Sequence, residues 1–150
     1  MKNKILALLL ITSLTLTVLT GCSVQESILS YFYYSRGVNY YEKGEKDKAL
    51  AAYSQSILLE PKFVVSYYGR GIIYSEQGEE DKALTDYSQA ILIDPKFALP
   101  YHGRGNIYYE KGEKDKALAD YKKAAELYLQ QGDTKYLPQV LEVIKQLENK

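Results

Sequence analysis

Arginine recurs in this chain at a constant spacing, and its side chain can form several kinds of polar and aromatic contact. The arginines are 34 residues apart, at Arg36, Arg70 and Arg104. A guanidinium group can stack on tyrosine rings and form paired hydrogen bonds with a carboxylate. Asp86 and Asp120 are candidate partners, whereas Ala52 interrupts that series. Because a buried arginine usually requires an anionic partner, we interpret the series as ion pairs between helices rather than as a ligand site.

No set of residues typical of a catalytic site accompanies these arginines. His102 is the only histidine and Cys22 the only cysteine, so we expect neither a metal site nor a Cys–His pair. The charges of the stretch EKGEKDKAL are typical of a solvated helix face. The sequence therefore predicts a protein that is not an enzyme and that binds no cofactor.

The first 22 residues have the layout of a secretory signal. Lys2 and Lys4 precede an uncharged apolar stretch over 5–20, which is short for a membrane-spanning helix of about 20 apolar residues. The stretch ends in Leu-Thr-Gly-Cys, which resembles the lipobox of bacterial lipoproteins. The resemblance implies removal of residues 1–21 and lipidation of Cys22. An ordinary cleaved signal and an uncleaved anchor are the alternatives.

A lipidated Cys22 implies an extracytoplasmic protein anchored to a bacterial membrane. Ser23 follows it rather than an aspartate, which resembles the outer-membrane sorting pattern of diderm bacteria. We expect residues 22–29 to form a tether. At about 3.5 Å per residue, this tether would keep the domain within about 30 Å of the bilayer and favour membrane-proximal partners.

Composition excludes one large class of partner. The chain has 19 basic and 19 acidic side chains, and removal of residues 1–21 takes away two lysines and leaves a formal charge of −2. Without a basic block, nucleic acid is not an expected partner. Tyrosine is abundant, with 16 residues, while tryptophan is absent.

The stretch YYEKGEKDKALA occurs at 40–51 and again at 108–119, and a shift of 34 residues aligns a diverged copy between them. This period and pattern resemble the tetratricopeptide repeat (TPR), a helix–turn–helix unit. The first copy has Tyr33, Gly37, Tyr40, Ala49, Tyr53 and Pro61 at the family's positions. The second has Tyr67, Gly71, Tyr74, Ala83, Tyr87 and Pro95. The third has Tyr101, Gly105, Tyr108, Ala117 and Tyr121, with Leu129 in place of proline.

The residues between these positions support the same fold. A glycine ends the first helix of each copy, at Gly44, Gly78 and Gly112, where a left-handed backbone is favourable. We predict an all-α fold, an α-solenoid of three TPR repeats over 30–63, 64–97 and 98–131. A turn at 132–134 and an apolar stripe predict a C-terminal capping helix within 132–150, with partner docking by that helix as the alternative.

In the TPR family the first helices line a concave groove that binds peptides or helices. Mapped on this chain, that groove contains Tyr34, Val38, Tyr41, Tyr68, Ile72, His102, Asn106 and Tyr109. Tyrosine gives contact area and a hydroxyl group at low entropic cost, so the groove suits a protein or peptide partner. Tyr33, Tyr40 and Tyr53 are expected to pack between helices instead.

Chaperone-binding TPR domains hold a C-terminal carboxylate with basic and amide side chains. The corresponding residues here are Tyr34, Val38, Gly69, Leu99 and Gly103, which cannot form a charge-assisted bond to it. The favoured function is therefore an adaptor or scaffold for another protein in envelope assembly. A self-associating structural protein and a binding protein for peptides or glycan fragments are the alternatives.

Overall fold

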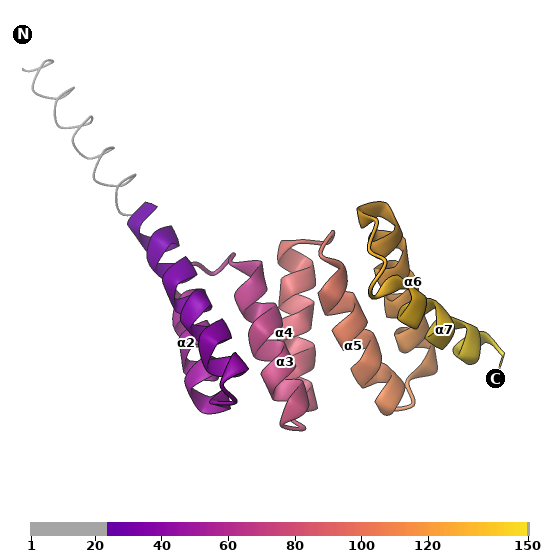
Figure 1. The fold of residues 1–150 in the computed structure, drawn as a ribbon. Helices are drawn as coiled ribbons and strands as arrows, with labels where there is room; N and C mark the ends of the chain where they lie inside the picture. Colours follow the sequence, from indigo (N-terminus) through magenta and orange to yellow (C-terminus); the bar gives the residue numbers. More distant parts are fainter. Residues whose placement is uncertain (1–23, 150) are drawn as a thin grey trace, which may run out of the picture.

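The computed structural model describes residues 24–149, and this part of the chain is built from helices (Figure 1). The predictions for residues 1–21 and for Cys22 lie outside it. The first described helix covers 24–42, and it is followed by α2 (Lys46–Leu59), α3 (Val64–Glu76), α4 (Glu80–Ile93), α5 (Ala98–Glu110), α6 (Lys114–Gln131) and α7 (Leu137–Glu148). The predicted all-α solenoid is confirmed. Within 24–149, no helix combines the length and the apolar character needed to cross a membrane.

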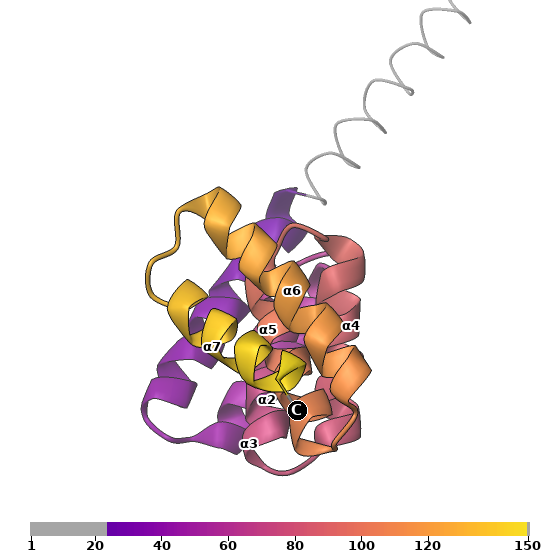
Figure 2. The ribbon, with the colours of Figure 1, turned by 90° about the vertical axis from the view of Figure 1, so that its right-hand side faces the viewer.

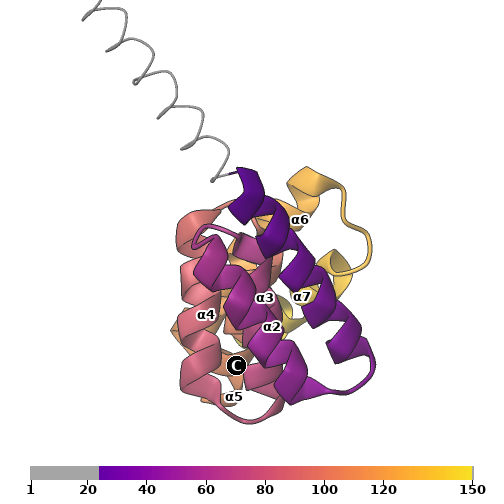
Figure 3. The ribbon, with the colours of Figure 1, turned by 90° about the vertical axis from the view of Figure 1, so that its left-hand side faces the viewer.

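The helices form two layers. The helix over 24–42, α3 and α5 lie in one layer, and α2, α4 and α6 lie in the other (Figures 2 and 3). From α2 onwards each helix packs on the next one in the chain, and α3 also contacts α5 in the next repeat. The last helix, α7, packs on α6 at the end of the stack. The layer of first helices therefore forms one continuous side of the molecule.

Each helix pair is joined by a tight turn built on a glycine. Gly44, Gly78 and Gly112 have φ angles of 75°, 75° and 73°. In the first turn the N–H of Glu45 donates to the carbonyl of Tyr40 at 2.9 Å, which closes the end of the helix over 24–42. A side chain with a Cβ is disfavoured at such a φ, so the predicted role of these glycines is confirmed.

A buried tyrosine occupies the centre of each repeat. Tyr53, Tyr87 and Tyr121 are only 3%, 3% and 2% exposed. The ring of Tyr53 lies between two glycines, because a Cβ on Gly37 would be 2.6 Å from it and a Cβ on Gly69 would be 2.7 Å from it. Gly69 belongs to the next repeat, so the ring joins two repeats. The predicted packing of Tyr53 between helices is confirmed.

The two ends of the described chain extend beyond the three repeats. Residues 24–29, assigned above to a tether, are helical and continue directly into the first repeat. At the other end, the Asp133 side chain accepts hydrogen bonds at 2.8 Å from the N–H groups of Lys135 and Tyr136. This turn precedes α7, and Pro138 lies in the first turn of that helix.

Candidate functional site

An aromatic row repeats along the layer of first helices. In the first repeat, the Tyr34 ring centroid lies 6.0 Å from that of Tyr53 and 5.5 Å from that of Phe63. In the second repeat, Tyr68 lies 6.0 Å from Tyr87 and 5.3 Å from Phe97. Each of these two tyrosines is thus held between the core tyrosine of its repeat and the phenylalanine that ends the same repeat. The row is rigid because packing fixes its rings on two sides.

The third repeat has His102 where the first two have a tyrosine. The ring of His102 lies 6.1 Å from each of Tyr121, Tyr128 and Tyr136, and its Nδ1 is 3.2 Å from the Tyr128 hydroxyl. Burial lowers the pKa of His102, so this imidazole is neutral at physiological pH. The segment before α7 therefore covers the C-terminal end of the aromatic row.

A polar contact links the first two repeats on the same side. The Tyr41 hydroxyl donates to a Glu76 carboxylate oxygen at 2.5 Å, and Lys46 Nζ lies 3.0 Å from the other oxygen. The hydrogen bond to Glu76, together with burial, raises the pKa of Tyr41 to about 12. The hydroxyl group therefore stays protonated and remains a donor at neutral pH.

Burial has the same effect on Tyr68 of the row and on the core tyrosines behind it. It raises the pKa of Tyr53 and of Tyr68 to about 12, and it raises the pKa of Tyr87 and of Tyr128 further. At the surface, the half-buried Tyr41 and Tyr68 thus offer aromatic area and neutral hydroxyl groups. Such a surface can bind an extended or helical polypeptide by packing and single hydrogen bonds.

The predicted groove residues all lie on the first helices of the repeats, and we call them together the first-helix face. They differ in access to solvent. Six are half-buried, namely Tyr34, Val38, Tyr41, Tyr68, Ile72 and His102. Asn106 and Tyr109 are exposed, and Asn106 Oδ1 accepts a hydrogen bond of 2.8 Å from the Tyr121 hydroxyl. The groove residues of the first repeat also pack on the core. Tyr34, Val38 and Tyr41 contact the buried cluster of Ala49, Tyr53 and Ile73. The binding role of the first-helix face stays a prediction.

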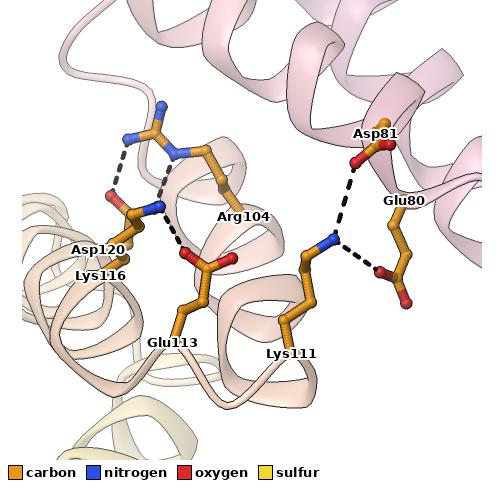
Figure 4. Close-up of polar contacts among 7 residues, drawn as sticks. All are labelled: Glu80, Asp81, Arg104, Lys111, Glu113, Lys116 and Asp120. Carbon is orange, nitrogen blue, oxygen red and sulfur yellow. Dashed lines mark hydrogen bonds and ion pairs between the residues drawn. The ribbon is translucent and has the colours of Figure 1, made fainter.

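The arginine series forms the predicted ion pairs in two of the three repeats. Arg70 donates from Nε and Nη2 to the two carboxylate oxygens of Asp86, both at 2.8 Å, and from Nη1 to Ser54 at 3.0 Å. Arg104 repeats this geometry with Asp120 and Ser88. Figure 4 shows this pair, and beside it Lys111, which reaches Glu80 at 3.4 Å. The arginines therefore connect consecutive repeats.

Several contacts were missed by sequence reasoning. Ser54 and Ser88 directly follow the core tyrosines, so the 34-residue register contained the signal for their role. Glu76 corresponds to Glu42 and Glu110, but Tyr136 lies outside the repeats, and only the structure places these two side chains beside Tyr41 and His102. In the part of the chain that the structure describes, no three His, Cys, Asp or Glu side chains gather where they could hold a metal ion.

Comparison with solved structures gives similar helical stacks. The first TPR of Spaghetti (RPAP3), bound to the HSP90 peptide SRMEEVD, has a TM-score of 0.72 at 20% identity, covering 83% of this chain and 96% of that one. The TPR2B-domain:pHsp70-complex of yeast Sti1 has a TM-score of 0.75 at 19% identity, covering 82% of this chain and 98% of that one. MamA has a TM-score of 0.65 at 33% identity, covering 69% of this chain and 60% of that one. A search of curated protein sequences found no match.

Family models match most of the described chain. A TPR repeat model matches residues 37–78 and 73–112. A tetratricopeptide repeat model matches residues 98–133. The three matches together follow the helix pairs described above and span well over half of the sequence. The chain therefore belongs to the tetratricopeptide repeat family.

Proposed function

We propose that this protein is a lipid-anchored adaptor of a bacterial envelope that holds a segment of another protein on its first-helix face. It acts by binding and not by catalysis, as is general for TPR proteins. The observation that carries the proposal is the fixed aromatic row of Tyr34, Tyr68 and His102 in equivalent positions. Rings held in place lose little entropy on binding, which favours recognition of a partner.

The nature of the bound segment follows from the chemistry of this face. Two of the similar structures hold chaperone peptides. Chaperone-binding TPR domains hold a terminal carboxylate with polar or basic groups, and Val38, Leu99 and Gly103 occupy the corresponding places here. The segment that fits is therefore an internal one with apolar and aromatic side chains, supported by hydrogen bonds to tyrosine hydroxyl groups.

The membrane anchor would place the start of the first helix close to the bilayer. Val24 is helical and lies two residues after Cys22, a separation of at most about 7 Å in an extended chain. This value replaces the 30 Å expected from an eight-residue tether. The exposed side chains of Val24 and Ile28, at 59% and 67%, are suited to an apolar environment near the membrane. The partner is then a membrane protein or a protein of the membrane surface.

Site-specific photocrosslinking in the native membrane tests the proposal. A photoreactive residue at Tyr109, which is 40% exposed on α5, should crosslink to one major protein other than this chain. The same residue at Leu92, 74% exposed on α4 in the other layer, is the matched control and should give little of that product. Equal yields at both positions, or crosslinks only between copies of this chain, would contradict the proposal.

A further inference from the structure

The first repeat keeps the arginine of the series but lacks its carboxylate. Position 52, which corresponds to Asp86 and Asp120, is an alanine with 6% exposure. Arg36 Nη2 donates instead to the Tyr40 hydroxyl at 2.9 Å. Its Nε group has no protein partner among the described residues, whereas the Nε groups of the other two arginines each bind an aspartate.

The guanidinium group of Arg36 is nevertheless held as in the other repeats. Its carbon atom lies 6.0 Å from the Tyr33 ring centroid and 5.6 Å from that of Tyr40. The corresponding distances are 5.8 and 5.9 Å for Arg70, and 5.9 and 6.0 Å for Arg104. Stacking on two tyrosines therefore positions the group without help from a carboxylate.

A pocket lies where the missing carboxylate would be. It has a volume of about 230 Å³, and its lining includes Tyr33, Arg36, Tyr40, Lys48, Ala52 and Gln55. Lys48 is already paired with Glu45, so the charge of Arg36 is the uncompensated one. In the next repeat the equivalent lysine, Lys82, is likewise paired with Glu79, and Asp86 supplies the additional negative charge.

We propose that this pocket is a binding site for a carboxylate of a partner polypeptide. The carboxylate enters over Ala52 and accepts hydrogen bonds from Nε and Nη2 of Arg36, in the arrangement that Asp86 has with Arg70. The Tyr40 hydroxyl gives up its hydrogen bond from Nη2, because a bond to a carboxylate is stronger than one to a neutral phenol. The site rests on the protein-binding role proposed above, but it is separate from the first-helix face.

Nuclear magnetic resonance of the arginine side chains can test this site directly. The chain contains three arginines, so a full-length sample in detergent micelles, labelled at arginine nitrogen, gives three Nε–H signals. Titration with the capped peptide Ac-Gly-Ala-Asp-Ala-Gly-NH₂ should shift the Arg36 signal saturably. The signals of Arg70 and Arg104 serve as internal controls and should stay in place, because Asp86 and Asp120 already occupy those groups.

Two further peptides separate the possible sources of the carboxylate. Ac-Gly-Ala-Asn-Ala-Gly-NH₂ has no carboxylate and should have no effect. The same asparagine peptide with a free C-terminus presents only a terminal carboxylate. Binding of the aspartate peptide alone assigns the site to an acidic side chain, whereas comparable binding of the free C-terminus assigns it to carboxylates of both origins.

The variant Ala52→Asp fills the pocket from within the chain. The equivalent Asp86 and Asp120 are accommodated at 3% and 6% exposure, so this variant should fold, which circular dichroism verifies. We expect it to bind the aspartate peptide at least about tenfold more weakly than the wild type. Ala52→Asn, which fills the pocket without charge, should also block the peptide but leave the Arg36 signal unlike those of Arg70 and Arg104.

The proposal is wrong if the Arg36 signal responds no more than the other two, or if Ala52→Asp binds the peptide as the wild type does. It is also wrong if inorganic phosphate shifts the Arg36 signal at concentrations where the aspartate peptide does not. A failure of this kind leaves the photocrosslinking result at Tyr109 unaffected, since that position lies on α5.

Discussion

Arg70 and Asp86 form a two-point ion pair, with both hydrogen bonds at 2.8 Å and with the aspartate side chain only 5% exposed. Removing the arginine leaves a buried and unpaired carboxylate. We therefore expect Arg70→Leu to lower the free energy of unfolding by about 3 kcal/mol, the lower end for a broken buried pair because Arg70 itself is 20% exposed. Urea denaturation monitored by circular dichroism measures this loss.

Arg36→Leu is the matched control for that experiment, since Arg36 is exposed and has no carboxylate partner among residues 24–149. Its effect should stay within about 0.5 kcal/mol. The double variant Arg70→Leu with Asp86→Ala should recover much of the loss, because it removes the unpaired charge. Equal losses for Arg70→Leu and Arg36→Leu would show that the ion pair does not stabilise the fold.

The contact between Gly69 and Tyr53 gives a second prediction. A Cβ at Gly69 would lie 2.7 Å from the Tyr53 ring, which is itself 3% exposed and cannot move away freely. Gly69→Ala should therefore destabilise the fold by about 2 kcal/mol through overpacking between the first two repeats. The control is Ser75→Ala in the same helix. Unchanged thermal unfolding of Gly69→Ala would show that the Tyr53 ring shifts to accommodate the added Cβ, which would contradict this prediction.

Much of this fold could be predicted from the sequence because residues with the same structural role recur in all three repeats. Gly44 and its equivalents end the first helix of each repeat, and Tyr53 and its equivalents fill the centre of each repeat. The recurrence of these residues therefore indicated their roles. The aspartate partners of Arg70 and Arg104 were found in the same way. Ala52 interrupts the pattern, and at that interruption the structure places the pocket and Arg36, which has no carboxylate partner in the described part of the chain.

The candidate site was less accessible to sequence reasoning, because it depends on contacts that do not recur. His102 was expected in an open groove, but Tyr128 and Tyr136 pack around it from the longer α6 and the turn after it. Tyr136 lies outside the repeats, so no period indicated its place. Similarly, the helical start at 24 could not be inferred, because residues 24–29 have no aligned copy within the chain.

The tyrosine pKa values predict how the fold responds to alkaline pH. The pKa of Tyr53, Tyr68 and Tyr121 rises from 10.0 to about 12 through burial, and that of Tyr41 rises to about 12 through its bond to Glu76. A group whose pKa is higher in the folded state adds stability that is complete below the unfolded pKa and lost as pH rises through the folded one. Stability should therefore decrease between pH 10 and about 12.

Two spectroscopic signals measured on one sample test this prediction. The part of the phenolate absorbance that comes from the buried tyrosines should rise together with the loss of helical circular dichroism. Tyr41→Phe should reduce the alkaline loss of stability, whereas Tyr31→Phe, at a residue 61% exposed, should not. A single absorbance transition near pH 10 with intact helices would contradict the role of burial.

The proposed lipid anchor gives the last prediction, because Cys22 is the only cysteine of the chain. Cells that express the protein with radiolabelled palmitate should label the wild type, and Cys22→Ser should abolish both the label and removal of residues 1–21. Ser23→Ala is the matched control and should be labelled like the wild type. Two acyl chains contribute about 0.8 kcal/mol per buried CH₂ group, enough to keep the wild type in the membrane fraction after a high-salt wash.

An unlabelled wild type that is still cleaved would indicate an ordinary signal peptide, and the exposed Val24 and Ile28 would then need a protein surface rather than a bilayer to cover them.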